Sequence, residues 1–449
     1  MGGQRNERVT TRARLGRMLG AVALVASVTA ACAPMPEACV GFAPKPLPEF
    51  MFGSAATDIS GDAMRAAARI GYRWIRMPIR WNQLQPTVAT KPTLTLAELD
   101  ARPELVDEFA ATADWSTPDA ALRTANDLGL QVVGFVGASS PPTLNGAPLD
   151  PSTLGNERYL AQQSLVARAI VRRYGSARIG APADVDPIRV WQTENELNIA
   201  PAASLIGWRT PGGFEGFTSS PWSSFDFLTG LLRTLRNAVV QTDPAAVTVV
   251  NISTDSPAPF NVPFGRPDWP DVVSRWRTLA DVIAIDTYPN YYLSTPVDGT
   301  QVGADLAVVA ERVCPSQQVM VMETGYPNGP TARGYDAAKQ AEFLEQAWRS
   351  SDAAGAAGFM PFSITSGDPA NGTIPPGDQA LLDQLGRALG SGDLGSLAEL
   401  FLQHPDFVSE RLAAETQLVE GQWGVLGPNG EALPGLAVVQ RIGAETAGR

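Results

Sequence analysis

The sequence predicts one (βα)8 barrel, an α/β fold in which eight parallel strands alternate with helices. Short, β-branched and almost wholly apolar segments, as parallel strands buried on both faces require, alternate eight times with amphipathic segments of helical period. The connections are long enough to cross over a parallel sheet. The chain has 449 residues, 44% hydrophobic and 18% charged, which suits one barrel with insertions. A doubly wound open sheet is the alternative.

The predicted strands are short apolar runs that end at polar or turn residues. They cover residues 50–54, 73–79, 130–136, 188–194, 247–253, 281–288, 318–324 and 357–363. The predicted helices begin at Ser, Thr, Asp or Pro signals and several end at glycine. They cover residues 116–129, 156–175, 223–241, 269–280, 303–313, 335–350 and 434–445.

Loop lengths indicate where function lies. The segments after the second, fourth, fifth and eighth strands are long, whereas most returns from helix to strand are short. In barrels the loops that follow the strands build the active face, so we expect functional residues at strand C-termini. The last excursion, about 365–421, contains amphipathic stretches of its own and is predicted to be a helical insertion rather than a second domain.

Charge and motif content exclude several function classes. The net charge is -12 and the pI about 4.8, which argues against nucleic acid or an acidic glycan as partner and favours a neutral one. No phosphate-binding loop or dinucleotide fingerprint follows a predicted strand. The chain has a single histidine, His404, which argues against a Ser-His-Asp hydrolase and a His-ligated zinc site. We therefore expect no metal and no cofactor.

The N-terminus resembles an export signal. Five arginines precede an apolar run too short to span a bilayer comfortably, so residues 1–31 are predicted to be a signal peptide. The run ends in VTAAC, which is similar to the bacterial lipoprotein cleavage box, although Thr29 stands where that box prefers Leu. We expect lipidation of Cys32, with plain secretion as the alternative, then a Pro-rich tether over 32–47 and the barrel domain over 48–449.

Two further cysteines fit an oxidising compartment. Cys39 precedes the first predicted strand and Cys314 precedes the seventh, so both are expected at the N-terminal end of the barrel. A disulfide between them would stabilise the fold. Two unpaired thiols are the alternative.

Two carboxylates lie at strand ends. Asn195 and Glu196 follow the fourth strand in IRVWQTENELNI, and Glu323 ends the seventh in VMVMETGYP. These strands face each other across a barrel mouth, so the carboxylates are expected to converge on one ligand. Two carboxyl groups about 5 Å apart suit glycoside hydrolysis with retention, in which one protonates the leaving oxygen and the other attacks the anomeric carbon.

These motifs resemble the clan-A glycoside hydrolases, which are retaining enzymes on (βα)8 barrels. The resemblance implies that Glu196 is the acid/base, Glu323 the nucleophile, and Asn195 a ligand of the sugar 2-hydroxyl. It also implies that Arg76, in GYRWIRMPIRWNQLQP, and Tyr288, in DVIAIDTYPNYY, contact the nucleophile. The strand ends look most similar to endo-acting β-galactanases and β-glucanases. The likeness runs over about residues 48–445, carried by short motifs.

The roles also follow from charge. A cation and a hydroxyl beside Glu323 favour its ionised form, whereas the negative Glu323 favours the protonated form of Glu196. The structural alternatives are a helix-start acid for Glu196, a core ion pair for Arg76 and a packed aromatic for Tyr288. Glu194 is expected to support the site as a partner of Arg76 or Arg189, or else to form a salt bridge in the helical layer.

Aromatic residues in the rim loops are candidates for stacking on sugar rings. They are Trp81, Trp208, Trp222, Tyr291, Tyr292 and Trp423. One departure concerns the eighth strand, GFMPFS, where many clan members place a tryptophan under the sugar. A second is the absence of a rim histidine.

Together these observations predict a retaining glycoside hydrolase acting on a neutral β-linked poly- or oligosaccharide. We expect a monomer without a nucleic-acid partner, exported and either anchored to a membrane surface by lipid or secreted. The alternatives are a transglycosylase that uses the same residues and a surface glycan-binding protein on a degenerate barrel.

Overall fold

The fold was analysed in a computed structural model of the chain. It describes residues 39–55, 58–137, 141–200, 219–254, 267–367, 377–391, 393–407, 411–412 and 418–449. Cys32, Trp208 and the predicted signal peptide lie outside these residues.

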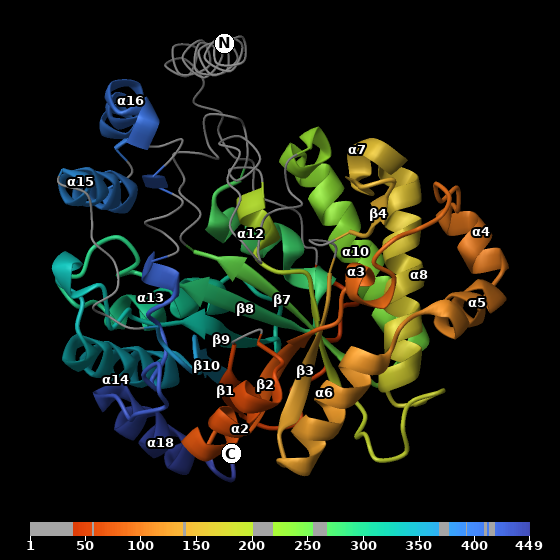
Figure 1. The fold of residues 1–449 in the computed structure, drawn as a ribbon, viewed down its shortest axis with the longest axis horizontal. Helices are drawn as coiled ribbons and strands as arrows, with labels where there is room; N and C mark the ends of the chain where they lie inside the picture. Colours follow the sequence, from red (N-terminus) through yellow and green to blue (C-terminus); the bar gives the residue numbers. More distant parts are fainter. Residues whose placement is uncertain are drawn as a thin grey trace.

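Eight parallel strands close into a barrel, as predicted (Figure 1). Around the barrel the order is β1-β10-β9-β8-β7-β6-β3-β2. The strands are β1 (Met51–Ser54), β2 (Trp74–Pro78), β3 (Gln131–Val136), β6 (Val190–Thr193), β7 (Val247–Ser253), β8 (Val282–Thr287), β9 (Gln318–Thr324) and β10 (Gly358–Pro361). Each lies within one residue or two of its predicted range, and almost every strand residue is buried.

A helix follows each barrel strand and packs on its outer face (Figure 1). These helices are α2 (Gly61–Ile70), α6 (Ser116–Asp127), α8 (Asn156–Tyr174), α10 (Phe225–Thr242), α12 (Trp269–Trp276), α13 (Thr300–Ala310), α14 (Ala337–Ala353) and α18 (Pro434–Thr446). The side-chain oxygen of Ser224 caps α10 by accepting from Phe227 N, and that of Asp336 caps α14 by accepting from Ala338 N and Lys339 N. The sequence analysis missed α2 and predicted the others.

Shorter elements decorate the loops at the strand C-termini. After β2 come α3 (Trp81–Leu84), α4 (Leu96–Ala101) and α5 (Glu104–Thr112), and after β3 come the hairpin β4 (Thr143–Leu144) and β5 (Ala147–Pro148) with α7 (Pro151–Leu154). The 3-10 turns η2 (Leu197–Ile199), η3 (Ser220–Ser223) and η6 (Thr331–Arg333) also lie in these loops, whereas η5 (Arg277–Leu279) connects α12 to the start of β8.

The excursion after β10 is helical where it is described, as predicted. Its helices are α15 (Asp378–Ser391) and α16 (Leu394–Gln403), which stand at one side of the barrel in Figure 1. They share a small apolar cluster that includes Leu385 and Leu400, and Tyr292 from the loop after β8 packs against it.

The segment before β1 lies against the N-terminal end of the barrel. Cys39 and Cys314 form the predicted disulfide. Lys45 N donates to Asp281 Oδ1 at 3.2 Å, and Leu47 N donates to Gln318 Oε1 at 2.6 Å. From residue 39 onward the predicted tether is therefore packed on the barrel and is not a free linker.

Two apolar layers fill the structure. Side chains inside the barrel, among them Trp74, Val190 and Met320, form one cluster, and the contacts between strands and helices form a larger one.

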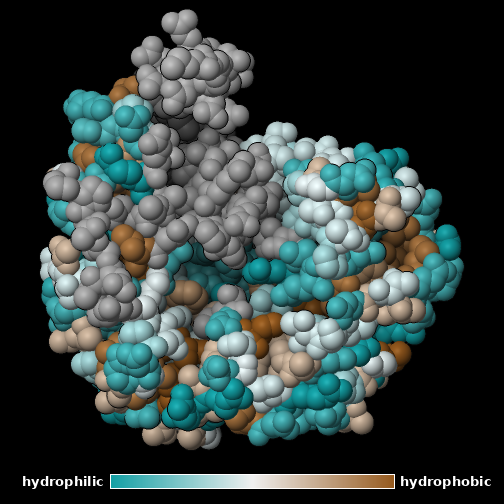
Figure 2. All heavy atoms as spheres, viewed as in Figure 1, coloured by the Kyte–Doolittle hydropathy of each residue, from teal (hydrophilic) through white to brown (hydrophobic). Residues whose placement is uncertain are grey.

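On the face seen in Figure 2, hydrophobic residues of the described part lie scattered among hydrophilic ones, and the surface is hollowed near the middle. Within the described residues, no helix is both long and apolar enough to cross a bilayer.

Candidate active site

Glu323, at the C-terminal end of β9, is held by a cation and a hydroxyl. Its Oε1 lies 2.5 Å from Arg76 Nη1, and its Oε2 accepts from the Tyr288 hydroxyl at 2.8 Å. Arg76 and Glu323 are buried, with side chains only 3% and 8% exposed. Burial lowers the pKa of Arg76, but the charges of Glu323, Asp286 and Tyr288 together outweigh burial and raise the pKa overall. The contacts expected from the resemblance are thus present.

The segment that follows β6 turns sharply. Glu194 and Glu196 have φ angles of 63° and 46°, in the left-handed region that residues other than glycine seldom occupy. Asn195 lies between them. Side chains alternate along a regular strand, so two consecutive residues cannot both face the barrel axis. The left-handed turns break this alternation, which fits both Asn195 and Glu196 serving the site.

Asn195 links the two candidate catalytic residues. Its Oδ1 accepts from Arg76 Nη1 at 2.9 Å, and its Nδ2 lies 3.4 Å from Glu196 Oε2. Arg76 in turn binds Glu323, so contacts run from one carboxylate to the other. Both carboxylates also act on Tyr288, whose pKa burial raises well above its usual range and the charges of Glu323 and Glu196 raise further. Glu196 and Glu323 are therefore connected through Asn195 and Arg76.

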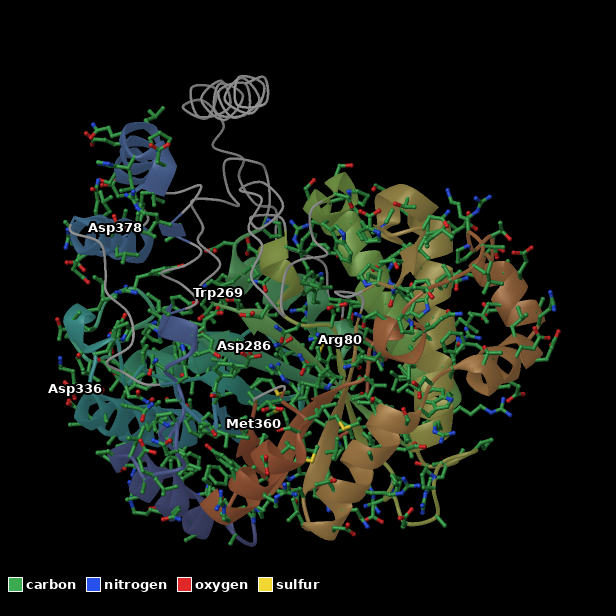
Figure 3. The ribbon with its side chains drawn as sticks, viewed as in Figure 1. Arg80, Trp269, Asp286, Asp336, Met360 and Asp378 are labelled. Carbon is green, nitrogen blue, oxygen red and sulfur yellow. A yellow bond between two sulfur atoms is a disulfide. The ribbon has the colours of Figure 1, made fainter. Side chains whose placement is uncertain are left out.

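A group of buried polar side chains beside this pair was not predicted from the sequence. Gln192, Asn251 and Asp286 come from the neighbouring strands β6, β7 and β8, and none is more than 1% exposed. Gln192 Nε2 donates to Asn251 Oδ1 at 3.0 Å, and Asn251 Nδ2 donates to Asp286 Oδ2. Figure 3 shows Asp286 near the centre of the molecule. Each is a polar residue near the end of an apolar strand, a signal that could have found them.

Asp286 is a buried acid among other charges. Burial raises its pKa well above the usual range, and the carboxylates of Glu323 and Glu196 raise it further, whereas Arg76 lowers it. The Oδ1 atom of Asp286 is buried without a hydrogen-bond partner in the described part of the chain.

Glu194 is buried on the other side of its turn. It is 1% exposed, and its charge acts on Arg80 and on Tyr159 of α8. Burial lowers the pKa of Arg80, which lies 5.9 Å from the ring centroid of Phe135. The arginine that the structure brings near Glu194 is thus one that the sequence analysis did not consider.

Two of the predicted sugar-stacking residues belong to the core, so that prediction is wrong for them. Trp81 and Trp222 are each 1% exposed. The indole N–H of Trp81 donates to Gln85 Oε1 at 3.1 Å, and Trp222 packs edge-on against Tyr159 and Phe227. Neither ring offers an open face to a sugar.

Trp423 follows the helical insertion after β10, and its ring packs against Tyr288. Its ring centroid lies 4.6 Å from that of Tyr288 and 5.5 Å from that of Tyr291. Trp423 is only 2% exposed, so it packs edge-on against the Tyr288 ring and has no exposed face on which a sugar could stack. Phe362, from the end of β10, packs edge-on against both Tyr288 and Trp423.

A further carboxyl, Glu420, enters beside this aromatic group. Its Oε1 accepts from the hydroxyl of the half-buried Tyr291 at 2.7 Å. Burial raises the pKa of Glu420, the bond from Tyr291 lowers it, and the charge of Glu323 raises it. Tyr292 instead packs on the helical excursion. Tyr291 is half-buried, and its ring centroid lies 6.2 Å from that of Tyr288.

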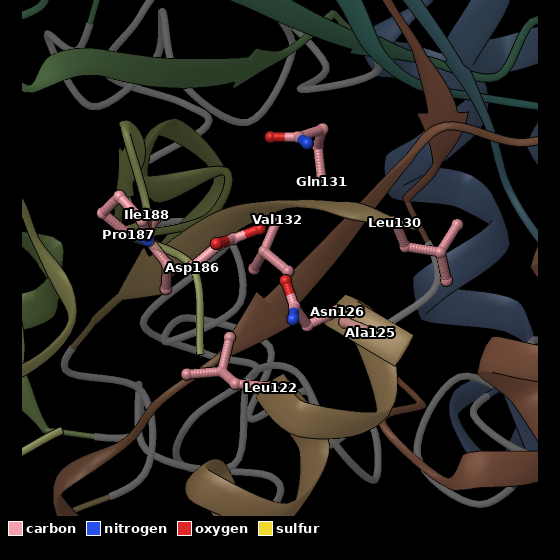
Figure 4. Close-up of a pocket in the computed structure, with 9 residues that line it drawn as sticks. All are labelled: Leu122, Ala125, Asn126, Leu130, Gln131, Val132, Asp186, Pro187 and Ile188. Carbon is pink, nitrogen blue, oxygen red and sulfur yellow. The ribbon is translucent and has the colours of Figure 1, made fainter. Parts of the chain in front are cut away.

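Two other kinds of site were considered in the described residues: a metal site and a second pocket. Among the described residues, no group of three or more His, Cys, Asp or Glu side chains is arranged to hold a metal ion. A small pocket lies between α6 and the start of β3, where Figure 4 shows Asn126 and Asp186 among mostly apolar side chains. It is near the N-terminal ends of the strands, away from Glu323.

Comparisons with known proteins show the fold. No family model and no curated protein matches the sequence. A β-glycosidase from Thermosphaera aggregans is similar in structure, with a TM-score of 0.53 and 12% identity over 86% of this chain and 84% of that one. A GH5_18 protein from Bifidobacterium longum, solved with Manβ1-4GlcNAc, has a TM-score of 0.51 and 12% identity over 86% and 73%.

An exo-β-1,4-mannosidase from an Opitutaceae bacterium has a TM-score of 0.49 and 15% identity over 86% of this chain. This chain spans 55% of that mannosidase. The barrel fold is shared with the Thermosphaera aggregans β-glycosidase and the Bifidobacterium longum protein.

Proposed function

We propose that this protein is a retaining glycoside hydrolase acting on a neutral β-linked glycan. Glu323 is the nucleophile and Glu196 the acid/base. The observation that carries the proposal is the buried Glu323 carboxylate, bound by Arg76 at 2.5 Å and by Tyr288 at 2.8 Å, and connected through Asn195 to Glu196. Structures of glycoside hydrolases with the same fold support it.

In the first step, Glu323 attacks the anomeric carbon and forms a glycosyl ester. Glu196 gives its proton to the glycosidic oxygen as the bond to the leaving group breaks. Arg76 and Tyr288 direct the carboxylate and keep it ionised until attack. Asn195 Nδ2, which faces Glu196, donates to the sugar 2-hydroxyl.

In the second step, Glu196 is ionised and acts as a base. It takes a proton from water, the water oxygen attacks the anomeric carbon, and Glu323 departs as a carboxylate. Two inversions give net retention. If a second sugar replaces water as acceptor, the same residues perform transglycosylation.

The charges of the site support a neutral substrate. The charge of Glu323 acts on two neighbouring carboxyl groups, and the pKa values of Asp286 and Glu420 are raised, first by burial and also by that charge. A sugar carboxylate would add negative charge where charge is already costly. Tyr291, beside Tyr288, is the aromatic residue best placed to contact the sugar.

Azide rescue tests the proposal and separates the two roles. Wild type is first screened on aryl glycosides and neutral β-glycans. In Glu323→Ala, azide replaces the missing nucleophile and should yield the α-glycosyl azide. In Glu196→Ala, azide intercepts the glycosyl ester and should yield the β-glycosyl azide. Asp226→Ala, on an outer helix, is the control and should turn over without azide.

The outcomes separate the rivals. Turnover that survives in Glu323→Ala without azide contradicts the assigned nucleophile. Binding of a glycan by wild type without any turnover would favour the glycan-binding alternative. Oligosaccharides longer than the substrate would identify transglycosylation.

We also propose that the protein is exported and carries lipid on Cys32. The disulfide between Cys39 and Cys314 supports an oxidising compartment. Membrane fractionation tests this: wild type should sediment with membranes and label with radioactive palmitate, and Cys32→Ala should do neither. Equal sedimentation of both would contradict lipidation.

A further inference from the structure

Asp286 has no part in the double displacement, yet it is fully buried and is the register partner of Glu323 on the neighbouring strand. We propose that Asp286 is a positioning residue that, through Asn251, fixes the direction in which Asn195 and Glu196 face the substrate. The inference rests on the proposed function and adds to it. What matters is an acceptor oxygen at position 286, rather than a negative charge.

Asn251 connects Asp286 to Asn195 and Glu196 because both the nitrogen and the oxygen of its side-chain amide form hydrogen bonds. Its Nδ2 donates to Asp286 Oδ2 and, at 2.6 Å, to Asn195 Oδ1. Its Oδ1 accepts from Glu196 N at 3.2 Å and from Gln192 Nε2 at 3.0 Å. If the amide were reversed, its oxygen would face two acceptors and its nitrogen two donors. An acceptor at Asp286 excludes this reversed state.

The orientation of Asn251 determines that of Asn195. Asn195 Oδ1 receives Arg76 Nη1 at 2.9 Å, Asn251 Nδ2 at 2.6 Å and Gln192 Nε2 at 3.2 Å. With three donors directed at its oxygen, the Asn195 amide presents its nitrogen toward Glu196 and the substrate. The bond from Glu196 N to Asn251 also holds the left-handed turn.

The acceptor role does not require ionisation. The groups that act electrostatically on Asp286 are Glu323, Glu196 and Arg76, with Tyr288 nearby. Burial and the two carboxylates raise the pKa of Asp286, whereas Arg76 lowers it. A neutral carboxylic acid still accepts through its carbonyl oxygen. An asparagine amide can do the same, whereas leucine cannot.

Steady-state kinetics of Asp286→Asn and Asp286→Leu test the inference. Asp286→Asn should keep kcat/KM within about threefold of wild type. Asp286→Leu should lose about tenfold to a hundredfold, the effect of one or two hydrogen bonds to catalytic groups. On a 2-deoxy glycoside, which offers Asn195 no hydroxyl, the loss in Asp286→Leu should shrink at least threefold. Equal losses in both variants would overturn the acceptor role.

A swapped pair tests the direction of the bond. Asn251→Asp with Asp286→Asn keeps the composition and a bond between the two positions, but it turns an acceptor toward Asn195 Oδ1. This double variant should fold and remain impaired at least tenfold. Wild-type activity in the double variant would show that the direction of the hydrogen bond between positions 251 and 286 is irrelevant, and it would refute the inference. It also keeps the test decisive if Asp286→Leu does not fold.

Asp281→Asn is the matched control. Asp281 lies just before the same strand at the other end of the barrel, is 1% exposed, and accepts from Thr248 N at 2.9 Å and Thr248 Oγ1 at 2.8 Å. It should change stability without changing the ratio between hydroxylated and deoxy substrates. A change in that ratio equal to that of Asp286→Leu would indicate a general structural effect and overturn the assignment.

A crystal structure of the swapped pair provides a readout independent of turnover. We expect the Asn195 side chain to leave its contact with Arg76. An unchanged Asn195 would contradict the inference even in an active protein. Absence of turnover in wild type would contradict the proposed function alone.

Discussion

Arg76→Met removes the only partner of Glu323 Oε1 among the described residues and should destabilise the fold strongly. The pair is 2.5 Å apart, with side chains 3% and 8% exposed. Deleting one member of a buried pair leaves an uncompensated charge, which costs about 3–5 kcal/mol. In Arg76→Met with Glu323→Gln that charge is gone, so the double variant should recover about 2–3 kcal/mol relative to additivity.

Guanidinium unfolding followed by tryptophan fluorescence measures the free energies of unfolding of wild type, the two single variants and the double variant, which form a double-mutant cycle. Arg65→Met is the control: Arg65 pairs with Asp62 at 2.5 Å, but the side chains are 58% and 93% exposed, so its loss should cost less than about 1 kcal/mol. The reasoning is refuted if Arg76→Met unfolds within about 1 kcal/mol of wild type, or if the cycle is additive.

Three further perturbations have defined outcomes. Tyr288→Phe removes a 2.8 Å bond to a carboxylate and should lower kcat/KM about 10- to 100-fold without a comparable change in unfolding. Cys39→Ser opens a link across 275 residues and should lower the free energy of unfolding by about 5 kcal/mol; dithiothreitol should reproduce this loss in wild type but not in the variant. Hydrogen bonds from Trp348 and Arg349 lower the pKa of Glu445 from 4.5 to about 2. Glu445→Gln should therefore cost about 1 kcal/mol above pH 4.5, after allowance for solvent screening, and nothing below about pH 2; a loss independent of pH would contradict this.

The barrel strands could be predicted because burial on both faces leaves a local signature. Residues 319–322 are all apolar, and β9 forms over the predicted range, 318–324. Helix α2 was missed although Ser60 caps it and Gly71 ends it in the left-handed region. Its alanine- and arginine-rich sequence has a narrow apolar stripe, so the capping residues were the stronger signal.

Burial in the loops could not be predicted because it depends on contacts between distant segments. Trp81 and Trp222 both follow strand ends in the sequence, where a rim position is expected. Trp222 is nevertheless enclosed by Tyr159 and Phe227 from two helices. Trp423 contacts Tyr288 across 135 residues of sequence, 423 - 288, and only the folded chain reveals it.

The direction of the side chains of Asn195 and Glu196 was likewise not predictable from the local sequence. A strand pattern predicts that Asn195 and Glu196 face opposite sides, yet Asn195 contacts both Arg76 and Glu196, and Glu194 and Glu196 adopt left-handed angles. Such angles cost about 1–3 kcal/mol each. Asn251, from the next strand, accepts from Glu196 N and so helps to offset that cost. The same amide donates to Asn195 Oδ1. One side chain thus supports the strained turn and orients the group the turn presents, so a change among these buried polar side chains should affect catalysis and the turn together.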